Sequence, residues 1–95
     1  MRKIKPVVDI PALLESTMDL ESGHPVDGIL RQHNIPARHS AYDVVKRYKK
    51  NLDYYQMSVD SIYVDRWRKA VKKLEPVVKA IEDNLELIDS SKEVG

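Results

Sequence analysis

Cysteine is absent from this 95-residue sequence, which excludes disulfides, thiol nucleophiles and cysteine-ligated zinc. Glycine occurs only three times and phenylalanine not at all, so neither a glycine-rich phosphate loop nor a sheet with many tight turns is expected. The longest apolar runs have three residues, whereas a membrane-spanning helix needs roughly 20. No apolar stretch follows the charged residues 1–5, so no secretory signal is visible. These absences predict one small cytoplasmic domain without a membrane segment.

The near-neutral net charge of +1 hides an uneven distribution of the 16 basic and 15 acidic side chains. Residues 1–23 carry −1, residues 24–50 carry +4, residues 51–74 carry +2 and residues 75–95 carry −4. A basic middle beside an acidic tail indicates a polyanion-binding region next to an interaction or solvating tail. Charged helices that simply solvate their outer faces would give the same pattern.

Capping residues divide the first part of the chain into helices. After an extended arm, Asp9 is a suitable N-cap and Pro11 fits the first turn of a helix that Gly23 ends. A second helix of eight or nine residues opens at His24. It ends where Asn34 suits the left-handed conformation of a tight turn.

Apolar residues then recur every three or four positions along two longer segments, which is typical of helices. The third helix has the stripe Ala41, Val44, Val45, Tyr48, Leu52 and Tyr55. The last helix has a stripe close to a heptad repeat: Tyr63, Trp67, Ala70, Leu74, Val77, Ile81, Leu85 and Ile88. Ser58 and Asp60 are suitable N-caps for it, and Pro76 predicts a kink or a new start. With no strand pattern, the fold class is all-α: a small helical domain with a long C-terminal helix or helical hairpin.

Residues 24–48 contain the parts of a helix-turn-helix. The short second helix leads into a turn at Asn34, which Ile35 anchors, and then into a basic helix predicted over Ala37–Leu52. The outer face of that helix is polar and net basic, as readout of the DNA major groove requires. The predicted DNA-binding residues are Arg38, His39, Tyr42, Asp43, Lys46, Arg47 and Lys50.

These residues have different expected roles. Lys46, Arg47 and Lys50 are expected to reach phosphates, which position a protein without reading sequence. Arg38 and His39 are expected near base edges. Asp43 would repel phosphate unless it accepts a hydrogen bond from a cytosine amino group or pairs with Arg47.

The pattern resembles the helix-turn-helix of phage small terminase subunits and of related transposase-type and repressor domains. The resemblance rests on the segments Ile29-Leu30, Asn34-Ile35-Pro36 and Lys46-Arg47-Tyr48. Many such motifs have glycine at the turn, where this chain has Asn34. The resemblance implies a sequence-specific, non-catalytic duplex DNA-binding protein that recognises DNA for packaging or regulates transcription. It also implies an oligomerising segment after the DNA-binding domain.

The predicted organisation follows from these features. Residues 1–8 form a basic arm, residues 9–57 the helix-turn-helix domain, residues 58–90 an oligomerisation helix and residues 91–95 a frayed tail. The C-terminal stripe is too long for three short helices to cover, although part of it can fold back as a hairpin, so a homo-oligomer is expected. The predicted interface residues are Tyr63, Trp67, Leu74, Val77, Ile81, Leu85 and Ile88.

Other chemistry finds little support in the sequence. His24, His33 and His39 lack the i,i+4 spacing of a helical metal site, so neither a metal nor another cofactor is expected. Ser40 has no nucleophile-activating surroundings, and no enzyme activity is predicted. The alternative function is a small protein-interaction module, such as an inhibitor, antitoxin or scaffold, that binds a protein partner through the acidic C-terminal region.

Overall fold

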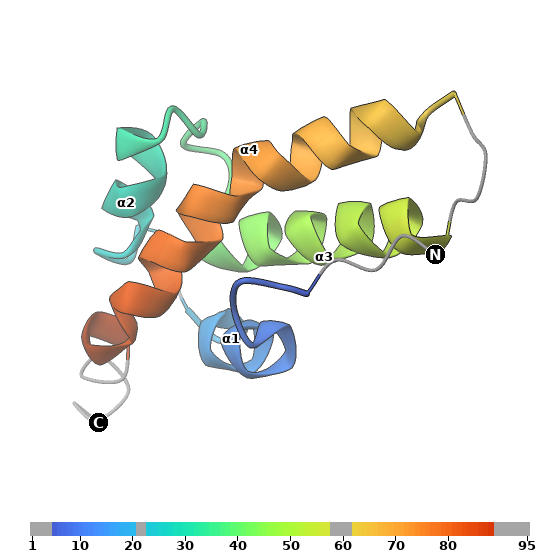
Figure 1. Cartoon of the computed structure of the whole chain (residues 1–95). Helices are drawn as coiled ribbons and strands as arrows, with labels where there is room; N and C mark the ends of the chain where they lie inside the picture. The colour runs from blue at the N-terminus through green and yellow to red at the C-terminus, as the bar shows by residue number, and fades with distance from the viewer. Residues whose placement is uncertain (1–4, 21–22, 58–61, 89–95) are drawn as a thin grey trace.

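The computed structural model describes residues 5–20, 23–57 and 62–88, and these contain helices and no strand, which confirms the all-α prediction. The helices are α1 (Ile10–Thr17), α2 (Asp27–Gln32), α3 (Ala41–Met57) and α4 (Val64–Asp83), with one more helical turn at 85–88. Helices α3 and α4 form a long antiparallel hairpin (Figure 1). Helix α1 packs on α3, and α2 packs on α4. Because the hairpin extends beyond α1 and α2, the molecule is elongated, with extents of 49 × 23 × 17 Å.

Helix α1 begins where the sequence predicts. The Asp9 carboxylate accepts a hydrogen bond from the Ala12 backbone N–H at 3.2 Å, and Pro11 occupies the first turn, where its missing N–H costs nothing. The helix ends at Thr17 rather than at Gly23. The Thr17 hydroxyl donates to the Leu13 carbonyl at 2.9 Å and is buried, while Gly23 adopts a positive φ of 88° in the following turn.

Helix α2 has six residues instead of the predicted eight or nine, but it ends at the predicted place. Asn34 has φ 63°, the left-handed conformation predicted from its side chain. The Asn34 N–H donates to the Arg31 carbonyl, and the Ile35 N–H donates to the Leu30 carbonyl at 2.8 Å. This pair of bonds is the Schellman arrangement that commonly ends helices, with asparagine in place of glycine.

Helix α3 begins at Ala41, four residues later than predicted, because Ser40 caps it. The Ser40 hydroxyl accepts a hydrogen bond from the Asp43 N–H at 3.2 Å, and the Asp43 carboxylate accepts one from the Ser40 N–H at 3.1 Å. This reciprocal capping box satisfies two backbone donors that would otherwise lack partners. Arg38 and His39 therefore lie in the connection before the helix and not on its surface.

The helix-turn-helix prediction is wrong in its geometry. Eight residues, 33–40, separate α2 from α3, whereas a helix-turn-helix uses three or four. Helix α2 packs against α4, and its contact with α3 is minor. Figure 1 shows α2 beyond the end of α3, beside the middle of α4. Helix α3 is thus held by α1 and α4, not by α2.

The hairpin core follows the two predicted stripes. The buried residues of α3 are Ala41, Val44, Val45, Tyr48 and Leu52. The buried residues of α4 are Val64, Val71, Leu74, Val77, Val78 and Ile81, and Ile88 beyond the helix is also fully buried. The predicted return of the C-terminal stripe onto α3 is therefore confirmed.

This burial corrects the oligomer argument. The interface assigned to the C-terminal stripe includes Leu74, Val77, Ile81 and Ile88, which are at most 7% exposed within the single chain. A 20-residue helix that folds back on a 17-residue helix buries most of this stripe, and α2 packs on α4 as well. Leu85 is half-buried on the same core. Tyr63, at 50% exposed, and the half-buried Trp67 and Leu85 are the members of the predicted interface that remain accessible.

Pro76 lies inside α4 and does not interrupt its assignment as one helix. Figure 1 shows that α4 changes direction near its middle, so that its second half turns toward α1. Proline has no N–H to donate to the carbonyl four residues earlier, which is the usual cause of such a bend. The kink predicted from Pro76 is confirmed, and no new helix start is found there.

Several predictions concern residues outside the described ranges. These are the arm residues Arg2 and Lys3, the N-caps Ser58 and Asp60, and the frayed tail 91–95. The described end of the arm is not free, because Val8 is buried in the core. Among the described helices, none combines the length and the apolar character needed to cross a bilayer.

Candidate nucleic-acid interface

The exposed side of α3 carries four basic residues, of which Lys49 pairs with Asp53 and Lys46, Arg47 and Lys50 do not pair with any described acidic residue. Positions three and four apart are neighbours on a helix surface, so the latter three side chains form one group along the helix. We call them, together with Arg38 and His39 just before the helix, the cationic face. His39, Lys46, Arg47 and Lys50 line one shallow depression with Asp43, so the structure brings together five of the seven predicted DNA-binding residues.

The two remaining predicted residues lie close by. Arg38 is exposed and borders the cleft described below. Tyr42 lies in the first turn of α3 and is half-buried, with the Lys46 ammonium 5.4 Å from its ring centroid. This cation–π contact holds the Lys46 side chain against the helix surface.

Asp43 has a structural contact that was not predicted from the sequence. Its carboxylate accepts the Ser40 N–H and lies at the positive end of the α3 dipole. It makes no ion pair with Arg47 among the described residues. The Asp43 carboxylate caps its own helix, and one acidic side chain beside Lys46, Arg47 and Lys50 leaves this face net basic.

Three of the described cations have acidic partners, and none of the three belongs to the cationic face. Lys49 pairs with Asp53 at 2.8 Å, and Arg68 pairs with Asp65 at 3.3 Å. Lys79 contacts both Glu82 and Asp83, which raise the pKa of its ammonium. By contrast, across residues 5–20, 23–57 and 62–88 no acidic side chain forms an ion pair with Arg38, Lys46, Arg47 or Lys50. Their charge is available to an external anion.

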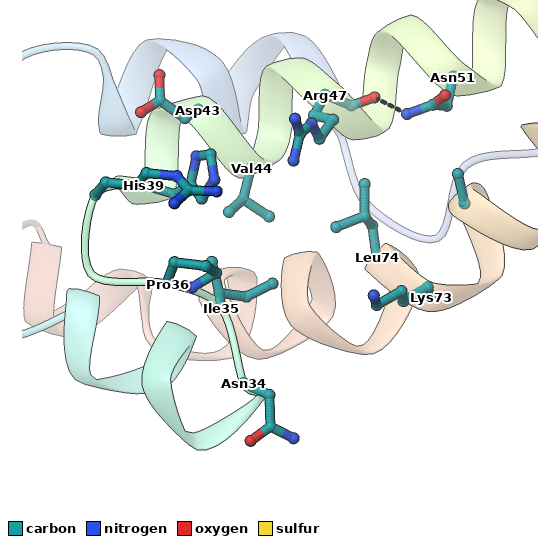
Figure 2. A pocket seen from close by; sticks show the side chains of 12 residues that line it. Asn34, Ile35, Pro36, His39, Asp43, Val44, Arg47, Asn51, Lys73 and Leu74 are labelled. Atoms are coloured by element: carbon teal, nitrogen blue, oxygen red, sulfur yellow. Dashed lines mark hydrogen bonds between the residues drawn. The ribbon is translucent and has the colours of Figure 1, made fainter.

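A cleft of about 350 Å³ lies between α3, α4 and the connection that precedes α3. Figure 2 shows Arg47 on the α3 side, Lys73 and Leu74 on the α4 side, and Ile35 with Pro36 at one end. Its base is apolar, and its rim carries cations from all three segments. Arg47 and His39 border both this cleft and the depression on α3, so the two hollows are contiguous.

Two polar residues of the cleft were not predicted from the sequence. Asn51 donates from its side chain to the Arg47 carbonyl at 2.9 Å, which leaves its side-chain oxygen free to accept (Figure 2). Lys73 reaches the cleft from α4. The sequence shows that residues 51–74, which include Lys73, carry net positive charge. It does not show that Lys73 lies near Arg47, because that depends on the packing of α4 on α3.

Metal chemistry finds no support in the described part of the chain, where no three His, Cys, Asp or Glu side chains gather into a possible site. Comparisons with protein-family models, curated proteins and solved structures find no match to this chain. The geometry and charge of the cationic face are therefore the observations that bear on function.

Proposed function

We propose that the protein binds duplex DNA through the cationic face, as a non-catalytic nucleic-acid-binding domain. The observation that carries this proposal is the group of exposed cations without acidic partners on and just before one helix: Arg38, Lys46, Arg47 and Lys50. Cations that are not neutralised within a protein attract polyanions and release counterions on binding.

The dimensions of α3 suit a DNA groove. Its 17 residues give a helix about 25 Å long, and the major groove of B-DNA admits a helix of ordinary diameter. Neither α1 nor α4 covers the exposed side, where Lys46 and Lys50 are one turn apart. In this arrangement Lys46, Arg47 and Lys50 contact phosphates, and Arg38 and His39 lie near the base edges.

The proposal does not need the helix-turn-helix arrangement. Helix α3 is fixed by α1 and α4, so α2 is free of the positioning role that the first helix has in that motif. Recognition of DNA for packaging, or control of transcription, is the role that the resemblance to small terminase subunits implies for such a protein.

The test is fluorescence anisotropy of a labelled duplex at several salt concentrations. Three or four neutralised phosphates predict that log affinity falls against log salt with a slope of about −3 to −4. The double variant Lys46→Ala/Lys50→Ala is expected to reduce that slope by about 2 and to weaken binding uniformly across sequences.

Lys79→Ala is the matched control, because it also removes a lysine but one that is paired with Glu82 and Asp83 on the other flank of α4. If the control and the double variant weaken binding equally, the cationic face is not the binding surface. Absence of duplex binding at low salt would refute the proposal altogether.

A protein-interaction module is the second candidate, and a different observation favours it. Met57 and Ile62, at the far end of the hairpin, are 78% and 88% exposed. Large apolar side chains exposed at the same end of a molecule can mark a protein contact. Replacement of both by serine is expected to abolish capture of a protein partner if this candidate is right, and to leave duplex binding unchanged.

A further inference from the structure

Three aromatic side chains gather near the far end of the hairpin. The ring centroids of Tyr54 and Trp67 are 5.5 Å apart, and those of Tyr63 and Trp67 are 6.1 Å apart. We call these three residues the aromatic cluster. Tyr54 is 44% exposed and Tyr63 is 50% exposed, so each ring leaves a large part of its surface to solvent. Buried apolar packing therefore does not account for the whole cluster.

Cations accompany the rings. The Lys50 ammonium lies 5.8 Å from the Tyr54 ring centroid, and the Arg66 guanidinium lies 5.9 Å from that of Tyr63. Both cations are exposed, and neither forms an ion pair within the described part of the chain. The cluster thus presents π surfaces with positive charge beside them.

The aromatic cluster continues the seam that contains the cleft. On α3 the cleft residues Arg47 and Asn51 are followed by Tyr54 at helical spacing, about 10 Å further along the helix than Arg47. On α4 the cleft residue Ala70 is preceded by Trp67 at the same kind of spacing. The seam between the two helices therefore has cations at the cleft and aromatic rings toward its far end.

This combination selects one class of partner. A positively charged groove that follows the phosphates, with aromatic rings on which bases stack, is how proteins bind single-stranded nucleic acid. A bilayer fits less well, because the chain segment that joins the helices contains Ser58, Asp60 and Ser61. A protein contact would use the rings but gives no role to the unpaired cations that run on toward Arg47 and Lys73.

We propose that the seam between α3 and α4 binds a single strand of nucleic acid, with its bases on Tyr54 and Trp67 and its phosphates near Lys50, Arg66 and Arg47. The inference rests on the proposed affinity for nucleic acid. It shares Arg47 and Lys50 with the cationic face but adds the aromatic cluster, which the duplex proposal does not use. The two surfaces together would hold a strand that leaves a duplex.

The probe is an oligothymidylate of about ten nucleotides, within the site sizes known for single-strand binding. Trp67 is the only tryptophan in the chain, so stacking of a base in the seam is expected to quench the intrinsic fluorescence. Tyr54→Leu retains an apolar side chain against Trp67 and removes the stacking surface. We expect it to weaken oligothymidylate binding by roughly 5- to 100-fold, while circular dichroism stays unchanged.

Tyr42→Leu is the matched control. Tyr42 is also on α3 and also has a lysine, Lys46, over its ring, but it lies at the other end of the helix, away from the seam. It is expected to leave oligothymidylate binding unchanged. Equal losses in the two tyrosine variants, or no quenching at low salt, would overturn the proposal.

A double comparison separates this inference from the duplex proposal. Lys46→Ala is expected to weaken duplex binding and spare the oligothymidylate, and Tyr54→Leu is expected to do the reverse. Duplex binding without oligothymidylate binding refutes only the seam, whereas loss of both refutes the proposed function. If Tyr54→Leu changes the mass of the protein in solution instead of its affinity for the strand, the aromatic cluster is a protein contact and the proposal is wrong.

Discussion

Tyr48 lies fully buried in the core between the helices, and its hydroxyl has no hydrogen-bond partner in the described part of the chain. The Val7 backbone is near the hydroxyl but does not meet hydrogen-bond geometry. Burial raises the pKa of the phenol, the Val7 backbone partly offsets this, and the Glu75 carboxylate raises it further. A buried polar group without a partner costs stability, so the hydroxyl is a weak point of an otherwise apolar core.

Tyr48→Phe is therefore expected to leave the free energy of unfolding at pH 7 unchanged or to raise it by about 1 kcal/mol. The pKa of Tyr48 in the folded state is above the unfolded value near 10, so folding favours the neutral phenol over the phenolate. The free energy of unfolding is therefore unaffected by this titration below pH 10 and decreases as the pH rises through the folded pKa. Urea unfolding between pH 7 and 11 should show a smaller alkaline loss in the variant. A loss of more than about 1 kcal/mol at pH 7 would mean that the hydroxyl has a partner.

Single residues also show how far the sequence predicts the site. The N-cap Asp9 and the left-handed Asn34 were predictable because each acts on its own backbone. Asp43 was expected to contact a cytosine amino group or Arg47, and its capping pair with Ser40 three residues earlier was missed. The signal for that pair was local, because a carboxylate three residues after a serine can satisfy the serine N–H at the start of a helix.

At the scale of the elements, α4 combines a proline with an uninterrupted apolar stripe. Pro76 is exposed, and residues on both sides of it, Leu74 and Val77, are buried in the same core. Packing on α3 and α2 therefore holds α4 in place, and the bend does not depend on the proline ring alone.

Pro76→Ala is expected to raise the free energy of unfolding by about 1–3 kcal/mol, because alanine restores a backbone hydrogen bond in a helix interior. Pro11→Ala is the control, since Pro11 is in the first turn of α1, where no such bond is missing; it is expected to change stability much less. Thermal and urea unfolding of both variants measure the difference. A less stable Pro76→Ala would show that the bend itself brings the second half of α4 to the core.

Apolar periodicity does not predict which helices of this fold pack on one another. Apolar spacing shows which face of a helix is covered but not which helix covers it. The stripe of α3 and that of α4 were both recognised, and their hairpin was one of two options. The partner of α2 was assigned to α3 because the two are adjacent in sequence, whereas the eight-residue connection lets α2 reach α4. Lys73 lines the cleft because α4 packs on α3, which is also a long-range pairing.

The whole molecule has a core that a single chain completes. Ile88 is fully buried beyond the end of α4, so the acidic C-terminal region belongs to the domain at least as far as this residue. Its neighbour Leu87 is 40% exposed and offers a comparison of nearly the same side chain one position away.

Ile88→Ala is expected to lower the free energy of unfolding by about 2–5 kcal/mol, and Leu87→Ala to change it by less than about 1 kcal/mol. The thermal midpoint of the unmodified protein should not depend on its concentration, because the core does not need a second chain. Unfolding scans over a wide range of concentrations check this. A midpoint that rises with concentration, or equal effects of the two variants, would show that the C-terminal stripe is shared between chains.

The projection of the hairpin beyond α1 and α2 makes the stability of the molecule uneven along its length. Near Tyr48 each helix of the hairpin is supported by other elements, whereas toward Met57 and Ile62 no other described helix lies against the two helices. Local opening costs least where few apolar contacts are lost. Backbone amides of the far half are therefore able to exchange with solvent while the other half stays folded. The hairpin is therefore held firmly at the end near α1 and α2. Its other end can change shape around a bound partner while the rest of the domain stays folded.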